Sequence, residues 1–303
     1  LLLEKMNYKA LRQEQVQLRK KNIYRGIGLA AMIEVTNPSP AFYGVGGARI
    51  SAQDGATLRL EPTGMVTVLC SVTEQGQGLE AVLTQIAATA VGVTLACVRM
   101  HTGDTDKTPY GGGTWASRAT GIGGEAVLQA GIELKRRVLE IAGILLKMKP
   151  EELDLLESKI VRRGTSESLM PLYELTRIVY YRTSDLPDDV QPELVVTRHF
   201  RVKDYAFVFT NGVQGSYLEI DTDTGFVKLL KHWCVEDCGR AINPKLVDEQ
   251  VYGGIVQGIG GALYEHFIYD ERGQLLTTTM ADYLVPLAGE MPCLSICCGS
   301  RGR

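Results

Sequence analysis

The sequence lacks several features by which common classes of protein are recognised. No uninterrupted apolar stretch approaches the ~18 residues of a membrane span, and the first ten residues do not follow the basic, apolar, small order of a signal peptide. The formal net charge is −3 at pH 7, so no basic surface of the kind that binds nucleic acid is expected. We therefore expect a cytoplasmic protein with neither a membrane span nor a nucleic-acid partner.

Motifs for phosphate binding and hydrolysis are missing as well. The sequence has no G-x-x-x-x-G-K-[ST] loop, no G-x-G-x-x-G after a strand pattern and no G-x-S-x-G around a serine. The four histidines stand apart, and Cys234 and Cys238 have no second cysteine or histidine pair to complete a zinc site. Iron–sulfur spacing of cysteines is absent too. These gaps argue against a hydrolase and against a zinc or iron–sulfur site on this chain.

The whole chain has an ordinary globular composition, 45% hydrophobic and 22% charged. Its first half shows alternating strand and helix patterns. Polar helix formers predict a helical lead-in over residues 1–21. Alternation over 56–73 predicts a hairpin, helical spacing follows over 79–91, and a longer apolar stripe over 127–145 predicts a long helix. The charged region 150–195 is expected to be an irregular connection with short helices.

The second half predicts three strands, within residues 193–202, 215–225 and 226–237, and then a helix. Asn243 is the expected N-cap of that helix, with Pro244 at its first position. A last hairpin is expected over residues 267–280. The fold class expected from this order is α+β, with mixed sheets and packed helices in two lobes, rather than a regular βαβ alternation.

Three glycine-rich turns share one design, in which glycines and a glutamine or hydroxyl precede or enter a helix. They are TEQGQGLE (73–80), GGGTWASRATGIGGEA (111–126) and GGIVQGIGGAL (253–263). A helix N-terminus favours an anion, glycine lets a ligand approach the backbone, and glutamine offers both a donor and an acceptor. Taken singly, glycines at a helix start more often mark a tight turn or close helix packing than a ligand site.

Taken in order, the three segments closely resemble the large, molybdopterin-binding subunit of the xanthine dehydrogenase/aldehyde oxidase family, including its carbon monoxide dehydrogenase-type members. The similarity extends to about Pro292. It implies the second molybdopterin-binding domain of molybdenum hydroxylases over residues 22–292, with lobes of about 22–160 and 190–292. It also implies a molybdenum–molybdopterin cofactor, often extended by a cytidine nucleotide, and oxidation of an aldehyde, an N-heterocycle or a similar small substrate with water as the oxygen source.

The resemblance also implies which residues bind the cofactor. Ala116 is the residue expected nearest the metal. No catalytic residue is expected on this chain, because the family's base is the glutamate of a Gly-Val-Gly-Glu-type segment that does not occur here, and Glu290 matches no catalytic position. The implied cofactor-binding residues are Gly76, Gln77, Gly78, Gly113, Thr114, Ala116, Ser117, Arg118, Ala119 and Gln257.

The resemblance also implies partner subunits, and the last eleven residues carry an expectation of their own. The family implies a further half of the molybdenum-binding subunit, a 2Fe-2S subunit or domain and an FAD subunit or domain. Two alternatives stay open: part of an enzyme that is inactive as an isolated chain, or a non-catalytic cofactor-binding or assembly module. Residues 293–303, CLSICCGSRGR, break the resemblance and hold three of the seven cysteines. We expect this tail to be a frameshift product, with a genuine short tail as the alternative.

Overall fold

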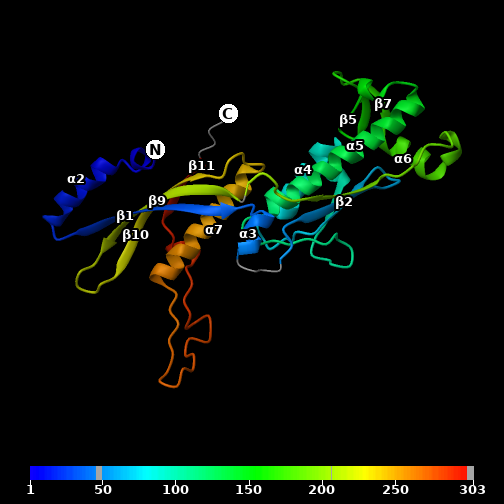
Figure 1. Cartoon of the computed structure of the whole chain (residues 1–303). Coiled ribbons are helices and arrows are strands. Elements are labelled where there is room, and N and C mark those ends of the chain that lie inside the picture. Colours follow the sequence, from blue (N-terminus) through cyan, green and yellow to red (C-terminus); the bar gives the residue numbers. More distant parts are fainter. Residues whose placement is uncertain (46–49, 206, 299–303) are drawn as a thin grey trace. The chain divides into compact units, whose positions relative to one another are not determined.

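The computed structural model describes residues 1–45, 50–205 and 207–298, which form two compact units (Figure 1). Unit 1 comprises Leu1–Glu34 and Phe209–Arg303, and unit 2 comprises Val35–Val208. Each unit contains a mixed sheet with helices packed on it, so the expected α+β class with mixed sheets is confirmed. Across the described ranges, no helix is both long enough and apolar enough to span a membrane.

Unit 1 is built on a four-stranded sheet in the order β1, β9, β10, β11. The hairpin of β9 and β10 is antiparallel, as its alternating pattern predicts, whereas β11 runs parallel to β10. The first residues of the atypical tail therefore form a strand of this sheet, and residues 299–303 lie outside the described residues. The strands are β1 (Tyr24–Thr36), β9 (Val208–Ile220), β10 (Val227–Asp237) and β11 (Cys293–Cys298).

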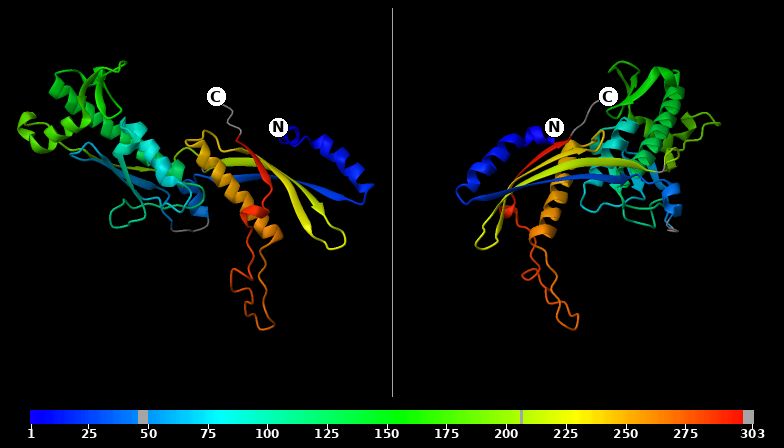
Figure 2. Two further views of the ribbon diagram at one scale, coloured as in Figure 1. Left: turned by 180° about the vertical axis from the view of Figure 1, so that it is seen from behind. Right: turned by 60° about the vertical axis from the view of Figure 1, so that its left-hand side comes forward.

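Helices cover both faces of this sheet (Figures 1 and 2). Successive residues of a strand point to opposite faces, and Trp233 and Cys234 of β10 accordingly join different apolar clusters. Trp233 packs with the N-terminal helices α1 (Leu2–Lys5) and α2 (Tyr8–Arg19), while Cys234 packs with α7 (Pro244–Leu263). The predicted cap of α7 is confirmed, because the Asn243 side chain accepts the Leu246 N–H at 3.3 Å.

His232, also on β10, is buried in its neutral form. Its side chain lies 2.9 Å from the Ser216 hydroxyl through Nδ1 and 3.1 Å from Gln214 Oε1 through Nε2. An imidazole with its proton on Nε2 satisfies both contacts, because Nε2–H donates to Gln214 and Nδ1 accepts from Ser216. Burial lowers the pKa of His232 below its ordinary value.

The stability of unit 1 is therefore expected to fall as the pH drops below about 6.5, the pKa of histidine in an unfolded chain. The unfolded chain takes up this proton at a higher pH than the folded chain does. The stability that unit 1 gains from burying neutral His232 is fully present above that pH. It is lost as the pH falls through the pKa of His232 in the folded chain. In a Trp115→Phe background, urea unfolding followed by Trp233 fluorescence at pH 7 and pH 5 should show a smaller loss in His232→Gln than with His232 present. His266→Gln, at an exposed position, controls for removal of an imidazole, and an unchanged loss in His232→Gln would contradict the prediction.

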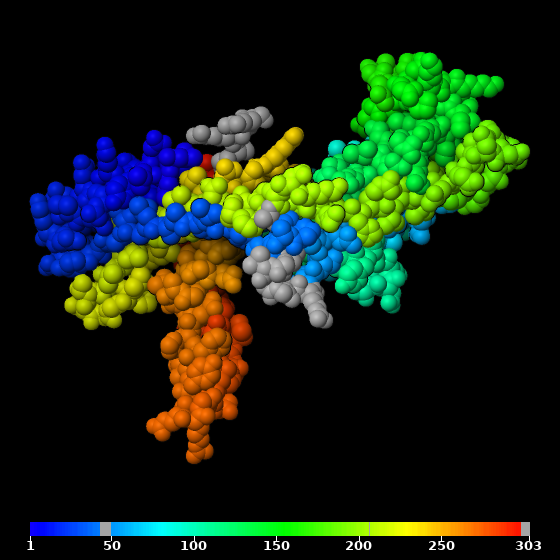
Figure 3. All heavy atoms as spheres, viewed as in Figure 1, coloured from blue at the N-terminus to red at the C-terminus, as the bar shows by residue number. Residues whose placement is uncertain are grey.

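A long segment follows α7 and extends away from the sheet (Figures 2 and 3). The hairpin expected over residues 267–280 is reduced to a single antiparallel bridge between Tyr269 and Leu275. The Phe267 and Tyr283 rings stack with centroids 4.6 Å apart, and the short helix η5 (Ala288–Glu290) precedes β11. Several large apolar side chains of this segment are exposed: Phe267, Ile268, Leu276, Met280, Leu284 and Leu287.

Unit 2 contains a second four-stranded sheet in the order β4, β3, β2, β8, on which two helices pack. The predicted hairpin of β2 and β3 is confirmed, and β4 adds to β3 in parallel. Gly92, with φ +94°, ends α4 as expected. The elements are β2 (Asp54–Leu60), β3 (Val66–Cys70), β4 (Val98–His101), β8 (Val195–Phe200), α4 (Leu79–Val91) and α5 (Gly124–Leu146), with α3 (Pro40–Val45) and η1 (Leu95–Cys97) outside the sheet.

The expectation of an irregular connection over residues 150–195 is wrong, although the short helices expected there are confirmed. This region forms a three-stranded antiparallel sheet and a ten-residue helix. Its strands have four residues each, too few for alternation to stand out from a charged background, although Leu153, Leu155 and Ile160 are fully buried. The elements are η3 (Pro150–Glu152), β5 (Leu153–Leu156), β6 (Lys159–Arg162), β7 (Ser168–Pro171), α6 (Leu172–Tyr181) and η4 (Thr183–Asp185).

Candidate functional site

The first glycine-rich segment, residues 73–80, wraps its backbone around the carboxylate of Glu74. Glu74 Oε1 accepts the N–H groups of Gln75 (3.1 Å), Gly76 (2.8 Å) and Gly78 (3.1 Å), and Oε2 accepts that of Glu80 (2.8 Å). Partial burial opposes ionisation of this carboxyl, yet the four N–H groups together lower the pKa of Glu74. The anion that suits the start of α4 is thus supplied by the chain itself.

The Gln77 side chain stabilises the same turn with two hydrogen bonds. Its Oε1 accepts the Gln75 N–H at 2.6 Å and its Nε2 donates to the Thr73 carbonyl at 3.2 Å. Gly76 and Gly78 have φ values of +94° and +79°, which favour glycine. A Cβ added to Gly76 would have no heavy atom within 4 Å, so this position borders open space.

The second glycine-rich segment lies directly beside the first. The Thr114 hydroxyl accepts the Thr73 N–H and donates to the Thr73 carbonyl, both at 2.8 Å. Gln75 Nε2 adds a bond of 3.4 Å to the Thr114 carbonyl. The Thr114 side chain therefore joins two segments through a residue 41 positions away in sequence. Gly113, next to it, has φ +79° and, like Gly76, borders open space.

The tip of the second segment is held in an unusual backbone conformation. Ala116 and Ser117 are exposed and have φ values of +48° and +52°, a left-handed conformation that is uncommon for residues other than glycine. Ala119 is buried and begins one turn of π-helix, η2 (Ala119–Gly123), which leads into α5. π-turns and strained residues both cluster at functional sites.

Arg118 follows this tip but points into the interior. Its Nη2 lies 2.5 Å from Asp54 Oδ2, its Nη1 donates to the Ser51 carbonyl at 2.8 Å, and both Arg118 and Asp54 are fully buried. Burial raises the pKa of Asp54, while Arg118 and the hydrogen bonds from Ser71 and Gly113 oppose that rise. The structure therefore places the Arg118 side chain away from the exposed tip.

The third glycine-rich segment belongs to α7 in unit 1. Gln257 is exposed on this helix, and Ile255 and Ile259 form its buried side. A Cβ added to any of four glycines of the helix would have no heavy atom within 4 Å; these are Gly253, Gly254, Gly258 and Gly261. The exposed side of α7 therefore has open backbone at these four glycines and also carries the side chains of Gln250, Tyr252 and Gln257.

Glu74 and Asp54 are the residues that sequence patterns missed. Glu74 precedes its glycines as an ordinary polar residue, and only the fold brings it to the start of α4. Asp54 lies 64 residues before Arg118, so no local spacing could pair them. Among the described residues, no three His, Cys, Asp or Glu side chains are grouped so that they could hold a metal ion.

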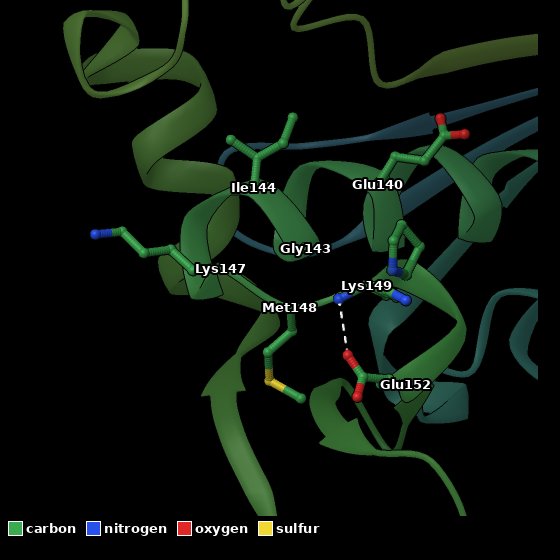
Figure 4. A pocket seen from close by; sticks show the side chains of 8 residues that line it. Glu140, Gly143, Ile144, Lys147, Met148, Lys149 and Glu152 are labelled. Carbon is green, nitrogen blue, oxygen red and sulfur yellow. Dashed lines mark hydrogen bonds between the residues drawn. The ribbon is translucent and has the colours of Figure 1, made fainter.

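A hollow at the C-terminal end of α5 is separate from these segments (Figure 4). Lys149 N–H donates to Glu152 Oε2 at 3.0 Å within it. Its lining begins at Glu140, 14 residues after the second glycine-rich segment ends at Ala126, which is ~21 Å along α5 at 1.5 Å per residue. We therefore do not count it in the site. Its lining residues are Glu140, Gly143, Ile144, Lys147, Met148, Lys149, Pro150 and Glu152.

Several known proteins are similar to this chain over nearly its whole length. The nicotine 6-hydroxylase large subunit of Paenarthrobacter nicotinovorans is 33% identical over 291 residues, covering 96% of this chain and 35% of that protein. The carbon monoxide dehydrogenase large chain of Hydrogenophaga pseudoflava is 28% identical over 298 residues, covering 96% and 36%. The crystal structure of quinoline 2-oxidoreductase from Pseudomonas putida 86 matches with a TM-score of 0.87 and 35% identity, covering 99% and 38%.

This chain thus spans about a third of the length of the curated relatives that it matches. The expected fold, that of molybdenum hydroxylase large-subunit domains, is confirmed by these neighbours. The family model described as molybdopterin cofactor-binding domain matches residues 1–292. The chain belongs to the molybdopterin cofactor-binding domain family of the molybdenum hydroxylases.

Proposed function

We propose that this chain is the cofactor-binding portion of a molybdenum hydroxylase that oxidises a small N-heterocyclic substrate with water as the oxygen source. The observation that carries the proposal is the junction made by Thr114, which fastens two glycine-rich segments into one surface with open positions at Gly76 and Gly113. The relatives named for nicotine and quinoline, both N-heterocycles, support this substrate class over an aldehyde.

The residues at this junction fit a large, flat, anionic cofactor. Gly113 and Gly76 have no side chain to keep a ring system away from the backbone, and Ser117 offers a hydroxyl at the exposed tip. The Ala116 N–H has no acceptor among the described residues, and we propose that it faces the metal end of the cofactor. The Arg118 and Ala119 side chains are buried, so their part would be taken by backbone groups.

Gln77 and Gln257 would contact the cofactor from different starting arrangements, because the Gln77 amide is already hydrogen-bonded and the Gln257 side chain is exposed. Gln77 already has two partners within its own turn, so a contact would use its remaining hydrogen-bonding capacity. Gln257 is exposed on the glycine-rich side of α7.

When bound, the molybdenum–molybdopterin cofactor supplies the redox chemistry, and this chain's residues bind and orient it. We propose that the catalytic base, the 2Fe-2S and FAD groups and the rest of the molybdenum site belong to other segments or subunits, and that the cofactor is the cytosine dinucleotide form.

Gly254→Leu is expected to lower cofactor content without harming the fold. The added side chain meets no atom of the described chain at its Cβ, and leucine favours a helix over glycine by about 0.5–1 kcal/mol. Crowding a packed contact costs about 1–3 kcal/mol, so molybdenum and pterin per assembled complex should fall about fivefold or more. Gly28→Leu, at another open glycine of unit 1, is the matched control. Full molybdenum content in the Gly254→Leu complex would contradict a cofactor contact on this surface.

Activity of the assembled complex separates the two functional alternatives. Incubation of the molybdenum-containing complex with quinoline in H₂¹⁸O should place ¹⁸O in the product, because the proposal takes the oxygen from water. A complex that holds molybdenum and pterin but transfers no oxygen to any N-heterocycle would favour the non-catalytic cofactor-binding or assembly module. A complex with neither molybdenum nor pterin would overturn both alternatives.

A further inference from the structure

One buried carboxylate connects the two ends of the exposed tip in the second glycine-rich segment. Asp54 Oδ1 accepts the Gly113 N–H at 3.2 Å, before the tip, and Asp54 Oδ2 lies 2.5 Å from Arg118 Nη2, after the tip. Ala116 and Ser117 lie between these two points. Segment 113–118 therefore contacts the Asp54 side chain at both of its ends, and the exposed tip lies between these two contacts.

Asp54 is itself held firmly in place. It is the first residue of β2, and the Ser71 hydroxyl donates to its Oδ1 at 2.8 Å and accepts the Gly55 N–H at 2.9 Å. Arg118 is anchored a second time by its bond to the Ser51 carbonyl. The carboxylate thus connects the tip to the four-stranded sheet of unit 2.

The tip needs such an anchor because its backbone is strained. Two consecutive non-glycine residues, Ala116 and Ser117, have positive φ values, and such conformations persist only where the surrounding structure imposes them. The centroid of the Trp115 ring lies 5.6 Å from Arg118 Cζ, and Trp115 Nε1 donates to the Gly112 carbonyl at 3.1 Å. Trp115 therefore contacts residues on both sides of itself within the segment.

We propose that Asp54 and Arg118 are positioning residues of the cofactor site, which fix both ends of segment 113–118 and hold Ala116 and Ser117 in their left-handed conformation. The proposal rests on the proposed function, in which those two residues meet the cofactor. Arg118 then acts through Asp54 from inside the fold and does not bind the cofactor's phosphate with its guanidinium. In some proteins a buried ion pair specifies one arrangement of the chain without adding net stability.

Two variants test the pair in the assembled complex and in the isolated chain. Asp54→Asn removes one charge, and the double variant Asp54→Leu/Arg118→Met replaces the pair by apolar residues of similar size, an exchange that buried ion pairs often tolerate without loss of folding. Asp104→Asn, which removes a carboxylate from the exposed Asp104–Lys107 pair at 2.7 Å, is the matched control.

Molybdenum and pterin per complex should fall about tenfold in both Asp54 variants, because small displacements of a positioned site have effects of that order or larger. The control should match the wild type. In the cofactor-free chain carrying Trp233→Phe, acrylamide quenching of the remaining Trp115 should rise about twofold in both variants as the tip loosens. This second measurement does not depend on the cofactor.

A folded double variant with wild-type cofactor content and wild-type quenching would overturn the positioning role. A wild-type complex without molybdenum or pterin would overturn the proposed function instead, and the quenching of Trp115 would still decide whether the pair orders the tip. Increased quenching in that case supports the anchoring of the tip by Asp54, and unchanged quenching refutes it.

Discussion

Gly112→Ala is expected to destabilise unit 2 by about 3–5 kcal/mol, the usual cost of separating a buried ion pair. A Cβ at Gly112 would lie 1.9 Å from Arg118 Nη1 and 2.3 Å from the Ser51 carbonyl oxygen, closer than any real contact of that kind. The guanidinium would have to leave its place beside Asp54, and two buried charges would lose their partners. Urea unfolding followed by Trp115 fluorescence in a Trp233→Phe background measures this loss in unit 2.

The neighbouring glycine provides the matched control. Gly113→Ala places a Cβ in open space, so its cost is only that of a left-handed backbone, about 1–2 kcal/mol. The two substitutions add the same methyl group one residue apart. Equal losses of unfolding free energy for Gly112→Ala and Gly113→Ala would contradict the crowding of Arg118.

Leu134→Ala should cost unit 2 about 2–5 kcal/mol, the range for leucine removed from a well-packed core. Leu134 is fully buried on the side of α5 that packs with the sheet of β2, β3, β4 and β8. Deleting its side chain removes apolar contacts and leaves a cavity. The same urea titration, followed by Trp115 fluorescence, reports the change.

Ile132→Ala, two residues earlier on the same helix, separates packing from helix propensity. Ile132 is 55% exposed, and surface substitutions usually change the free energy of unfolding by less than about 0.5 kcal/mol. A Leu134→Ala loss no larger than that of Ile132→Ala would show that this side of α5 does not carry the core.

The predictability of the fold depended on how strongly each segment's pattern stood out. The hairpin of β2 and β3, the helices α4 and α5 and the capped start of α7 were all predicted, because long periodic runs end at Gly92 or begin at Asn243 and Pro244. Strand β1 was missed, since Gly26 and Gly28 interrupt its pattern and most of its residues are exposed. Strands β5, β6 and β7 were missed because each has only four residues.

The candidate site was predictable only as segments. The glycine-rich sequences predicted open backbone, but only some of their glycines border open space. Gly76 and Gly113 do, whereas a Cβ at Gly111, Gly112, Gly121, Gly123 or Gly124 would lie within 3 Å of another atom. Nothing in the sequence indicated that Glu74 occupies the start of α4, or that Arg118 points inward to Asp54. Those contacts depend on the fold as a whole, so a motif that contains an arginine does not reveal whether that arginine faces a ligand.

A structure of the assembled complex with its cofactor, determined by cryo-electron microscopy or crystallography, tests the central claim most directly. We expect the cofactor's pterin to contact backbone or hydroxyl groups of Gly113, Thr114, Ala116 and Ser117. We also expect Gln257 to lie within hydrogen-bonding distance of the cofactor, and Arg118 to remain paired with Asp54. A cofactor bound without contact to segment 113–117 or to Gln257 would refute the proposed site.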